Sequence, residues 1–198
     1  MDTDISLLSL GELKSYIEGS TTGTTAYDAN YEAIIDSVSK YFNNYTGRHL
    51  KTATYTEYYD GNDSDELYLN QFPITDTSTV SIYILDETRS LTSDYLIDST
   101  DIQIYADEGK VWLYDDWFTE GHRNVYASYT AGYTSSGMPG DLKRAALETA
   151  LVFWNREDKK DRVGVRTESF EGGSRTYESD IPWGAKTILD NYRCKRFY

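Results

Sequence analysis

The spacing of apolar residues changes twice along this chain of 198 residues. At both ends they recur every three or four positions, as on one face of a helix; between Lys51 and Tyr133 they alternate with polar residues, as in half-buried strands. Each spacing buries its apolar side chains in only one kind of element, so helices are expected at both ends and strands between them. The sequence therefore predicts an α+β fold, a small helical bundle with an antiparallel β insertion between its second and third helices.

Local signals define the ends of four predicted helices. Ser9 and Glu12 have the spacing of a capping box, in which each side chain bonds the other residue's backbone amide. Gly19 and Gly47 follow the first two apolar stripes, where glycine commonly ends a helix. A proline opens each of the last two helices. The predicted helices cover Ser9–Gly19, about Tyr27–Tyr45, a stretch from Pro139 into the charged run Arg156–Arg162, and a short stretch from Pro182.

Seven short strands are predicted between the second and third helices. They are rich in Tyr, Val, Ile and Thr and are joined by short turns such as Asp107–Gly109, so neighbouring strands are expected to run antiparallel. The predicted strands are Ala53–Tyr59, Glu66–Asn70, Thr79–Leu85, Asp94–Asp98, Asp101–Ala106, Lys110–Tyr114 and Asn124–Tyr133.

The predicted elements divide one domain into three parts. Residues 1–50 hold the N-terminal helices of the core, and residues 51–133 form the β insertion. Residues 134–198 hold the third helix, an extended hairpin arm over Val163–Glu178 with its bend at Gly172 and Gly173, the last helix and a tail.

The acidic stretch Tyr58–Thr75, YYDGNDSDELYLNQFPIT, permits two interpretations. Asp60, Asn62 and Ser64 have the alternate spacing of a calcium loop, but its sixth and twelfth positions are Asp and Gln where such loops use Gly and Glu. The flanks resemble strands, and Asp-Gly favours a turn. The tip of a β-hairpin is therefore predicted, with weak cation binding near Asp60 left open.

The formal net charge of −14 comes from the first two thirds of the chain. Residues 1–139 hold 7 Lys and Arg against 23 Asp and Glu, whereas residues 140–198 hold 12 against 10. Proteins that grip duplex DNA neutralise its phosphates with many cations, so such a protein is not expected. An acidic surface instead repels phosphate and lets a duplex pass without sticking.

No catalytic residue, metal site or cofactor is predicted. His49 and His122 are expected to be solvated, because the sequence spacing gives neither of them convergent partners. Cys194 lies between Arg193 and Lys195, and cations can activate a thiol, but no base accompanies it. No glycine-rich stretch matches a phosphate-binding motif. An enzyme is therefore not expected.

The compartment is inferred from what the sequence contains. A single cysteine is compatible with a reducing environment. The N-terminal sequence MDTDISLLSLGELK does not resemble a signal peptide, and no stretch approaches the roughly 20 apolar residues of a membrane span. We expect a protein that is made in a cytoplasm and has no membrane partner.

The C-terminal segment ILDNYRCKRFY, residues 188–198, is basic and aromatic on an otherwise acidic chain. It is either a solvated tail or a peptide that docks on another protein, since Arg and Tyr commonly anchor protein interfaces. A basic end and an acidic body could also join copies head to tail, which closes into a ring when the rotation allows. The residues alone leave both interpretations open.

Three blocks in a shared order resemble the head-to-tail connector (adaptor) proteins of tailed bacteriophages. The first comprises NNYTGRHL at 43–50, YDG at 59–61 and LYLNQFPIT at 67–75. The second is YTAGYTSSGMPGDLKRAALETALVFWN at 129–155. The third is GVRTESFEGGSRTYES at 164–179, with LDNYRCKRF at 189–197. Together they span most of the chain from the second predicted helix onward.

The resemblance implies a structural protein of the virion neck. Members form a ring, commonly of twelve copies, below the portal at the capsid vertex, and they have a helical core with a β insertion. A tail or stopper protein meets the other side of the ring. Genomic DNA crosses its channel without sequence-specific binding, and Asp and Glu of residues 1–139 are the pool from which an acidic lining would come.

The resemblance also implies two sets of contact residues. In such proteins the C-terminal arm and tail typically reach the portal, which assigns portal docking to Arg193, Lys195, Arg196, Phe197 and Tyr198. Contacts between neighbouring subunits are assigned to Phe170, Tyr177 and Trp183.

Two other functions are compatible with parts of the sequence. A tail-completion or tail-terminator subunit would also be acidic and ring-forming, but the N-terminal helices and the DLKRAALETALVFWN helix favour the connector. A carbohydrate-binding β module would explain the 19 Tyr and 4 Trp. Such modules consist mostly of strands, so the flanking helices argue against it.

Overall fold

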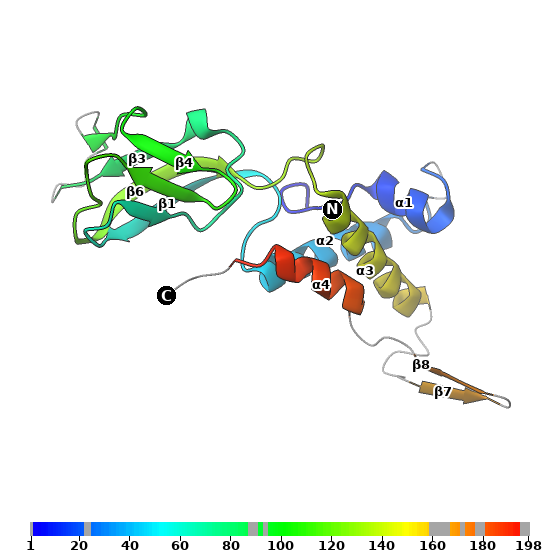
Figure 1. Ribbon diagram of the computed structural model, residues 1–198. Coiled ribbons are helices and arrows are strands. Elements are labelled where there is room, and N and C mark those ends of the chain that lie inside the picture. Colours follow the sequence, from blue (N-terminus) through cyan, green and yellow to red (C-terminus); the bar gives the residue numbers. More distant parts are fainter. Residues whose placement is uncertain are drawn as a thin grey trace. The chain divides into compact units, whose positions relative to one another are not determined.

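The computed structural model describes residues 2–21, 25–86, 91–92, 95–158, 167–170, 173–176 and 181–194. The chain forms two compact units (Figure 1). The helical unit comprises Met1–Gly47 and Ser135–Tyr198, and the β unit comprises Arg48–Thr134. The β unit is therefore inserted between the second and third helices, as the change in periodicity predicts.

The helical unit contains α1 (Leu10–Glu18), α2 (Asp28–Thr46), α3 (Gly140–Asp158) and α4 (Trp183–Asn191). The capping box of α1 is confirmed: the Glu12 amide donates to the Ser9 hydroxyl at 3.2 Å, and the Ser9 amide donates to the Glu12 carboxylate at 2.8 Å. Gly19 and Gly47 end their helices with φ values of 72° and 71°, a conformation that glycine adopts without steric cost.

Helices α2 and α3 each pack against the other three helices and form the centre of the bundle. The small side chains of α3 let the neighbouring backbones approach closely, and larger side chains of α1, α2 and α4 fill the remaining space. Burial is complete or nearly so for Leu13, Tyr31, Ile34, Ile35, Val38, Phe42, Leu142, Ala145, Ala146, Ala150, Ala185 and Leu189. The predicted stripe on α2 is too wide, because Tyr27, before its first turn, is exposed and Tyr41 and Tyr45 are only half-buried.

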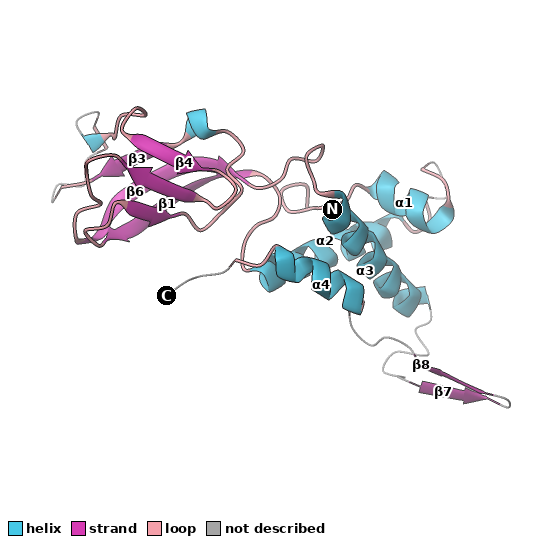
Figure 2. Ribbon diagram, viewed as in Figure 1, coloured by secondary structure: helices cyan, strands magenta, loops and turns pink. Residues whose placement is uncertain are grey.

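Six strands of the β unit form two three-stranded sheets (Figure 2). The first sheet has the order β1 (Ala53–Gly61), β6 (Gly121–Ala131), β3 (Ser81–Ile84). The second has the order β2 (Glu66–Tyr68), β5 (Lys110–Leu113), β4 (Ile102–Tyr105). A 3-10 turn, η1, covers Thr77–Thr79. All named strand pairs run antiparallel, which confirms that prediction.

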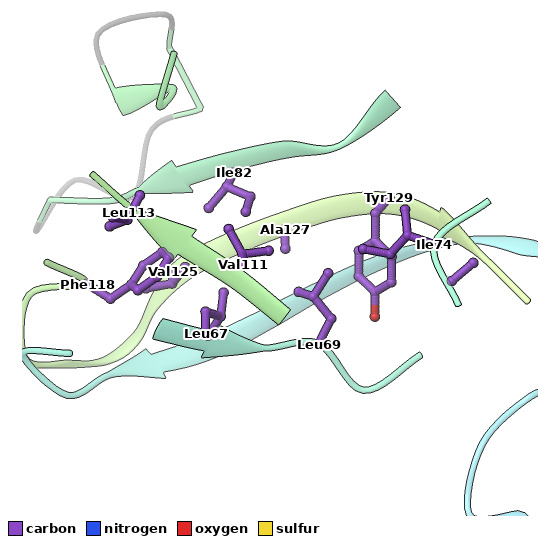
Figure 3. Close-up of a cluster of buried hydrophobic side chains, with 11 residues drawn as sticks. Leu67, Leu69, Ile74, Ile82, Val111, Leu113, Phe118, Val125, Ala127 and Tyr129 are labelled. Carbon is purple, nitrogen blue, oxygen red and sulfur yellow. The ribbon is translucent and has the colours of Figure 1, made fainter. Parts of the chain in front are cut away.

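The core of the β unit is formed by side chains from both sheets (Figure 3). Alternate residues of β6 are buried, as expected for a strand with one face on a core. The cluster consists of Leu67, Leu69, Ile74, Ile82, Val111, Leu113, Phe118, Val125, Ala127, Tyr129 and Ala131.

The prediction of a β-hairpin at Tyr58–Thr75 is wrong. Strand β1 pairs with β6, and β2 pairs with β5, so the acidic stretch crosses from one sheet to the other. The amides of Asn62 and Asp63 both donate to the carbonyl of Phe118, at 3.1 and 2.9 Å. The turn is therefore held by the segment before β6 and not by a facing strand of its own.

The predicted strands differ from the structure in their ends, and two of them differ most. Glu66–Asn70 is shortened to β2, because Asn70 and Gln71 donate their amides to the hydroxyls of Tyr59 and Tyr129 instead of continuing the ladder. Of the strand predicted at 94–98, Leu96 contributes an isolated bridge to Tyr83.

The hairpin arm contains β7 (Thr167–Phe170) and β8 (Gly173–Thr176), which pair antiparallel. Within the described parts of the chain, no helix is both long and apolar enough to cross a membrane.

Candidate interaction surfaces

The described part of the C-terminal segment, up to Cys194, is attached to the helices of its unit. The Cys194 amide donates to the carbonyl of Thr46 at 2.8 Å, which ties the segment to the end of α2. The Tyr192 hydroxyl donates to Asp141 at 2.7 Å, at the start of α3. Of the predicted portal-docking residues, Arg193 lies here, and Lys195, Arg196, Phe197 and Tyr198 lie outside the described residues.

An open pocket of about 730 Å³ lies beside this attachment point. The Tyr45 hydroxyl donates to Asp190 at 2.9 Å, and this hydrogen bond raises the pKa of Tyr45. The Arg193 guanidinium lies 5.9 Å from the centre of the Tyr45 ring. The lining residues are Asn44, Tyr45, Thr46, Gly47, Asp190, Arg193 and Cys194. Sequence reasoning placed Tyr45 in the buried stripe of α2 and so missed its place in this pocket.

Of the predicted subunit-contact residues, Trp183 does not line this pocket. Trp183 begins α4, at the opposite end of that helix from Arg193, and its side chain is 77% exposed. Phe170 is the last residue of β7 and is paired through its backbone with Gly173. Tyr177 lies outside the described residues. A large aromatic side chain with this exposure is costly to leave in water, so Trp183 is the described member best suited to contact another protein.

Asp60, at the end of β1, bonds the start of β6. The Asp60 carboxylate accepts the Arg123 amide at 2.6 Å and lies 3.0 Å from His122 Nδ1. The Arg123 hydrogen bond, followed by that of His122, holds the pKa of Asp60 below its usual range. His122 is exposed as expected, but it has a partner that sequence spacing could not reveal, 62 residues away.

Asn62 and Ser64, the other two residues of the calcium interpretation, lie in the turn between β1 and β2. The Ser64 hydroxyl accepts the Glu66 amide at 3.1 Å, and the Asn62 amide is bonded to Phe118. Among the described residues, no group of three or more His, Cys, Asp or Glu side chains is arranged to hold a metal ion. His49, the second histidine, is exposed and bonds the Gln71 side chain through its backbone amide at 2.8 Å.

A polar cluster inside the β unit is structural. Glu57 accepts hydrogen bonds from the hydroxyls of Tyr59 and Tyr129, one on its own strand and one on β6. Burial, and after it the Glu57 hydrogen bond, raises the pKa of both tyrosines. Each hydroxyl also accepts a backbone amide from the residues that follow β2. All of these groups are used to join β1, β6 and the end of β2.

The sequence profile of the head completion protein family matches residues 6–195. The chain belongs to the head completion protein family. No curated protein sequence matches it. A chain from the neck of an empty gene transfer agent (GTA) particle, with C6 symmetry, shares the fold with a TM-score of 0.65 at 14% identity, over 97% of this chain and 92% of that chain.

Two other solved structures share the fold at the same identity of 14%. One is the virion of a native GTA particle, with a TM-score of 0.61 over 97% of this chain and 92% of that chain. The other is the neck of a native GTA particle with C12 symmetry, with a TM-score of 0.56 over 98% and 96%. The family match confirms the predicted resemblance to head-to-tail connector proteins. The four helices and the antiparallel sheets confirm the predicted α+β fold.

Proposed function

We propose that this head completion protein is a subunit of a homo-oligomeric ring that joins the capsid to the tail. The observation that carries the proposal is the family match over residues 6–195. The shared fold with neck structures of C6 and C12 symmetry supports a ring, and C12 symmetry supports twelve copies. The role is structural and not enzymatic.

The C-terminal segment docks on the portal protein in this proposal. Arg193, Lys195, Arg196, Phe197 and Tyr198 supply three cations and two aromatic rings, side chains that anchor many protein interfaces. The hydrogen bond from Cys194 to Thr46 supports it, because a docking peptide that starts from a fixed point loses less conformational entropy on binding.

Neighbouring subunits meet through Trp183, Phe170 and Tyr177. The exposure of Trp183 supports this assignment, since an apolar surface of that size is stabilised when a partner covers it. A tail or stopper protein binds the opposite side of the ring.

The ring encloses a channel that genomic DNA crosses without sequence-specific binding. The charge distribution supports this part of the proposal. Residues 48–134 of the β unit hold 5 Lys and Arg against 16 Asp and Glu, and the helical unit holds 14 against 17. An acidic lining keeps phosphates at a distance, so that DNA is not retained.

Native mass measurement of the purified protein, alone and mixed with its portal, tests the proposal. We expect a ring alone or a ring only with portal, and loss of the portal complex when Arg193, Lys195 and Arg196 are changed to Glu. Arg193→Glu alone is compared with Lys186→Glu on α4 as the control, because each reverses one charge of the helical unit. Absence of association under both conditions would refute the ring.

A further inference from the structure

The β unit carries a groove on its surface, beside the buried core. The groove has a volume of about 540 Å³ and lies where the end of β3, residues 95–98 and the end of β5 meet. Backbone hydrogen bonds join these segments: the Ile97 amide donates to Ile82 at 2.9 Å, and the Tyr114 amide donates to Asp101 at 2.9 Å. The backbone fold therefore holds the segments that line the groove in place.

The floor of the groove is apolar and partly open. Leu113 belongs to the buried core (Figure 3), and Ile84 and Ile97 are half-buried beside it. Leu96 and Tyr114 are 42% and 41% exposed. Clustered apolar side chains left open to water in this way mark surfaces that bind another molecule.

The rim of the groove is acidic. Asp98, Asp101, Asp115 and Asp116 line it, and within the described part of the chain its lining includes no Lys, Arg or His. The Thr100 amide and hydroxyl donate to Asp98, and these bonds keep the pKa of that carboxyl below its usual range. Four carboxylates around an apolar floor produce a local negative potential in a unit that is already acidic.

We infer that this groove docks a basic and apolar segment of a neighbouring virion protein, one in which Lys or Arg side chains flank an aromatic or aliphatic side chain. Charge complementarity selects the cations, and burial on Leu96, Tyr114 and Ile97 stabilises the apolar side chain between them. The acidic rim repels nucleic acid and acidic peptides. The inference rests on the proposed function in one respect: it requires that another protein of the virion lies next to the β unit.

Three short amidated peptides separate charge from apolar contact. The first, Arg-Phe-Arg-Leu-Arg, has the inferred chemistry; Arg-Gly-Arg-Ser-Arg keeps the charge, and Glu-Phe-Glu-Leu-Glu keeps the apolar side chains. Fluorescence anisotropy of labelled peptides with the full chain measures each affinity. We expect the first peptide to bind at least about fivefold more tightly than the second, the effect of burying two apolar side chains in part, and the third not to bind.

Two matched variants locate the binding. Asp115→Asn with Asp116→Asn removes two charges from the rim; the positive φ of Asp115, 54°, is one that Asn also adopts. Asp107→Asn with Glu108→Gln removes two charges from the exposed turn between β4 and β5, at the other end of β5. We expect the rim variant to weaken binding by about fivefold and the turn variant to leave it unchanged. Leu96→Ser is expected to weaken binding of the first peptide and not of the second.

Equal effects of the two charge variants would overturn the inference, since they would show attraction to the acidic unit as a whole. Absence of binding by the first peptide would also overturn it. Neither result bears on the ring, because ring formation by the same rim variant is measured separately, and we expect no change in it. Failure of the groove and failure of the proposed function are therefore distinguishable.

Discussion

The helical unit and the β unit both bury large side chains, Tyr31 and Phe42 in the first and Phe118 and Tyr129 in the second, but the helical unit also buries three alanines on one helix. In the helical unit, α3 presents Ala145, Ala146 and Ala150 to its neighbours, so that backbones pack closely. In the β unit, two sheets are separated by large side chains such as Phe118 and Tyr129. The first core therefore has little room for added atoms, whereas the second depends on the atoms that it already contains.

The two units also differ in charge. The helical unit holds 14 Lys and Arg against 17 Asp and Glu, whereas the β unit holds 5 against 16. The near balance of the helical unit allows ion pairs such as Lys143 with Glu12, at 2.6 Å, and the pair of Lys14 with Asp28, at 2.5 Å. In the β unit, carboxylates are satisfied mainly by backbone amides and hydroxyls, as at Asp60, Asp76 and Asp98. A protein surface rich in carboxylates can therefore be stabilised without one Lys or Arg for each carboxylate.

Truncation of a large core side chain in the β unit should have the largest effect. Phe118→Ala is expected to lower the free energy of unfolding by about 3–5 kcal/mol, because Phe118 is 1% exposed and its removal leaves a cavity between the sheets. Hydrogen exchange read residue by residue should show faster exchange at Val111, Val125 and Ala127. Trp117→Ala, a change of the exposed neighbour, is the control and should shift stability by less than about 0.5 kcal/mol.

Enlargement should affect the helical unit. Ala146→Leu is expected to cost about 1–3 kcal/mol, because Ala146 is fully buried on α3 and a longer side chain forces the neighbouring helices apart. Thermal or chemical denaturation checks the value. A stability equal to that of the unmodified protein would show that the helical core has space, and the contrast between the two units would fail.

Two glycine substitutions should act in opposite directions. A Cβ at Gly61, where β1 ends, would lie 1.9 Å from the Thr119 carbonyl oxygen, so Gly61→Ala is expected to destabilise the protein by more than about 1 kcal/mol. Gly11 in α1 has nothing within 4 Å of an added Cβ, so Gly11→Ala is expected to stabilise it by about 0.4–1 kcal/mol. Denaturant midpoints of the two variants, compared with the unmodified chain, test both signs.

The smallest predicted effect is the pH dependence of the α1 cap. Burial alone would raise the pKa of Glu12, but hydrogen bonds from Lys143 and Ser9 outweigh it and lower the pKa from 4.5. A carboxyl with a lowered pKa in the folded state stabilises the protein above its unfolded pKa and loses this contribution as the pH falls through the folded value. The stability difference between the unmodified chain and Glu12→Gln should therefore be present at pH 7, at less than about 1 kcal/mol, and shrink below pH 4.5. A difference that is constant between pH 7 and pH 3 would contradict this origin.

Local features of the fold were predictable from the sequence. The Ser9–Glu12 box and the glycines at 19 and 47 act within one turn of a helix, so residue type and spacing suffice to identify them. The short turn at Asp107–Gly109 also lies between two strands that pair directly, β4 and β5.

Strand pairing was not predictable, and the error at Tyr58–Thr75 shows why. The alternation of β1 and β2 indicates strands but contains no information on which edge each strand meets. The correct partner of β1 is β6, with Thr56 opposite Ser128, and a hairpin was inferred only because β2 is nearest in sequence. The partner of His122 and the groove beside β5 were missed for the same reason, since both bring together segments distant in the chain.

The sequence by itself determined the order of helices and strands, the acidic character of the β insertion and the membership in the head completion protein family, because periodicity, composition and motifs are properties of neighbouring residues. Only the tertiary structure decided that β1 and β2 belong to different sheets, that Tyr45 and Asp190 flank the base of the C-terminal segment, and that four carboxylates surround an apolar groove. Each of these depends on the burial of side chains from several segments at once. Which strands and side chains come together therefore depends on packing in the core and not on the local sequence.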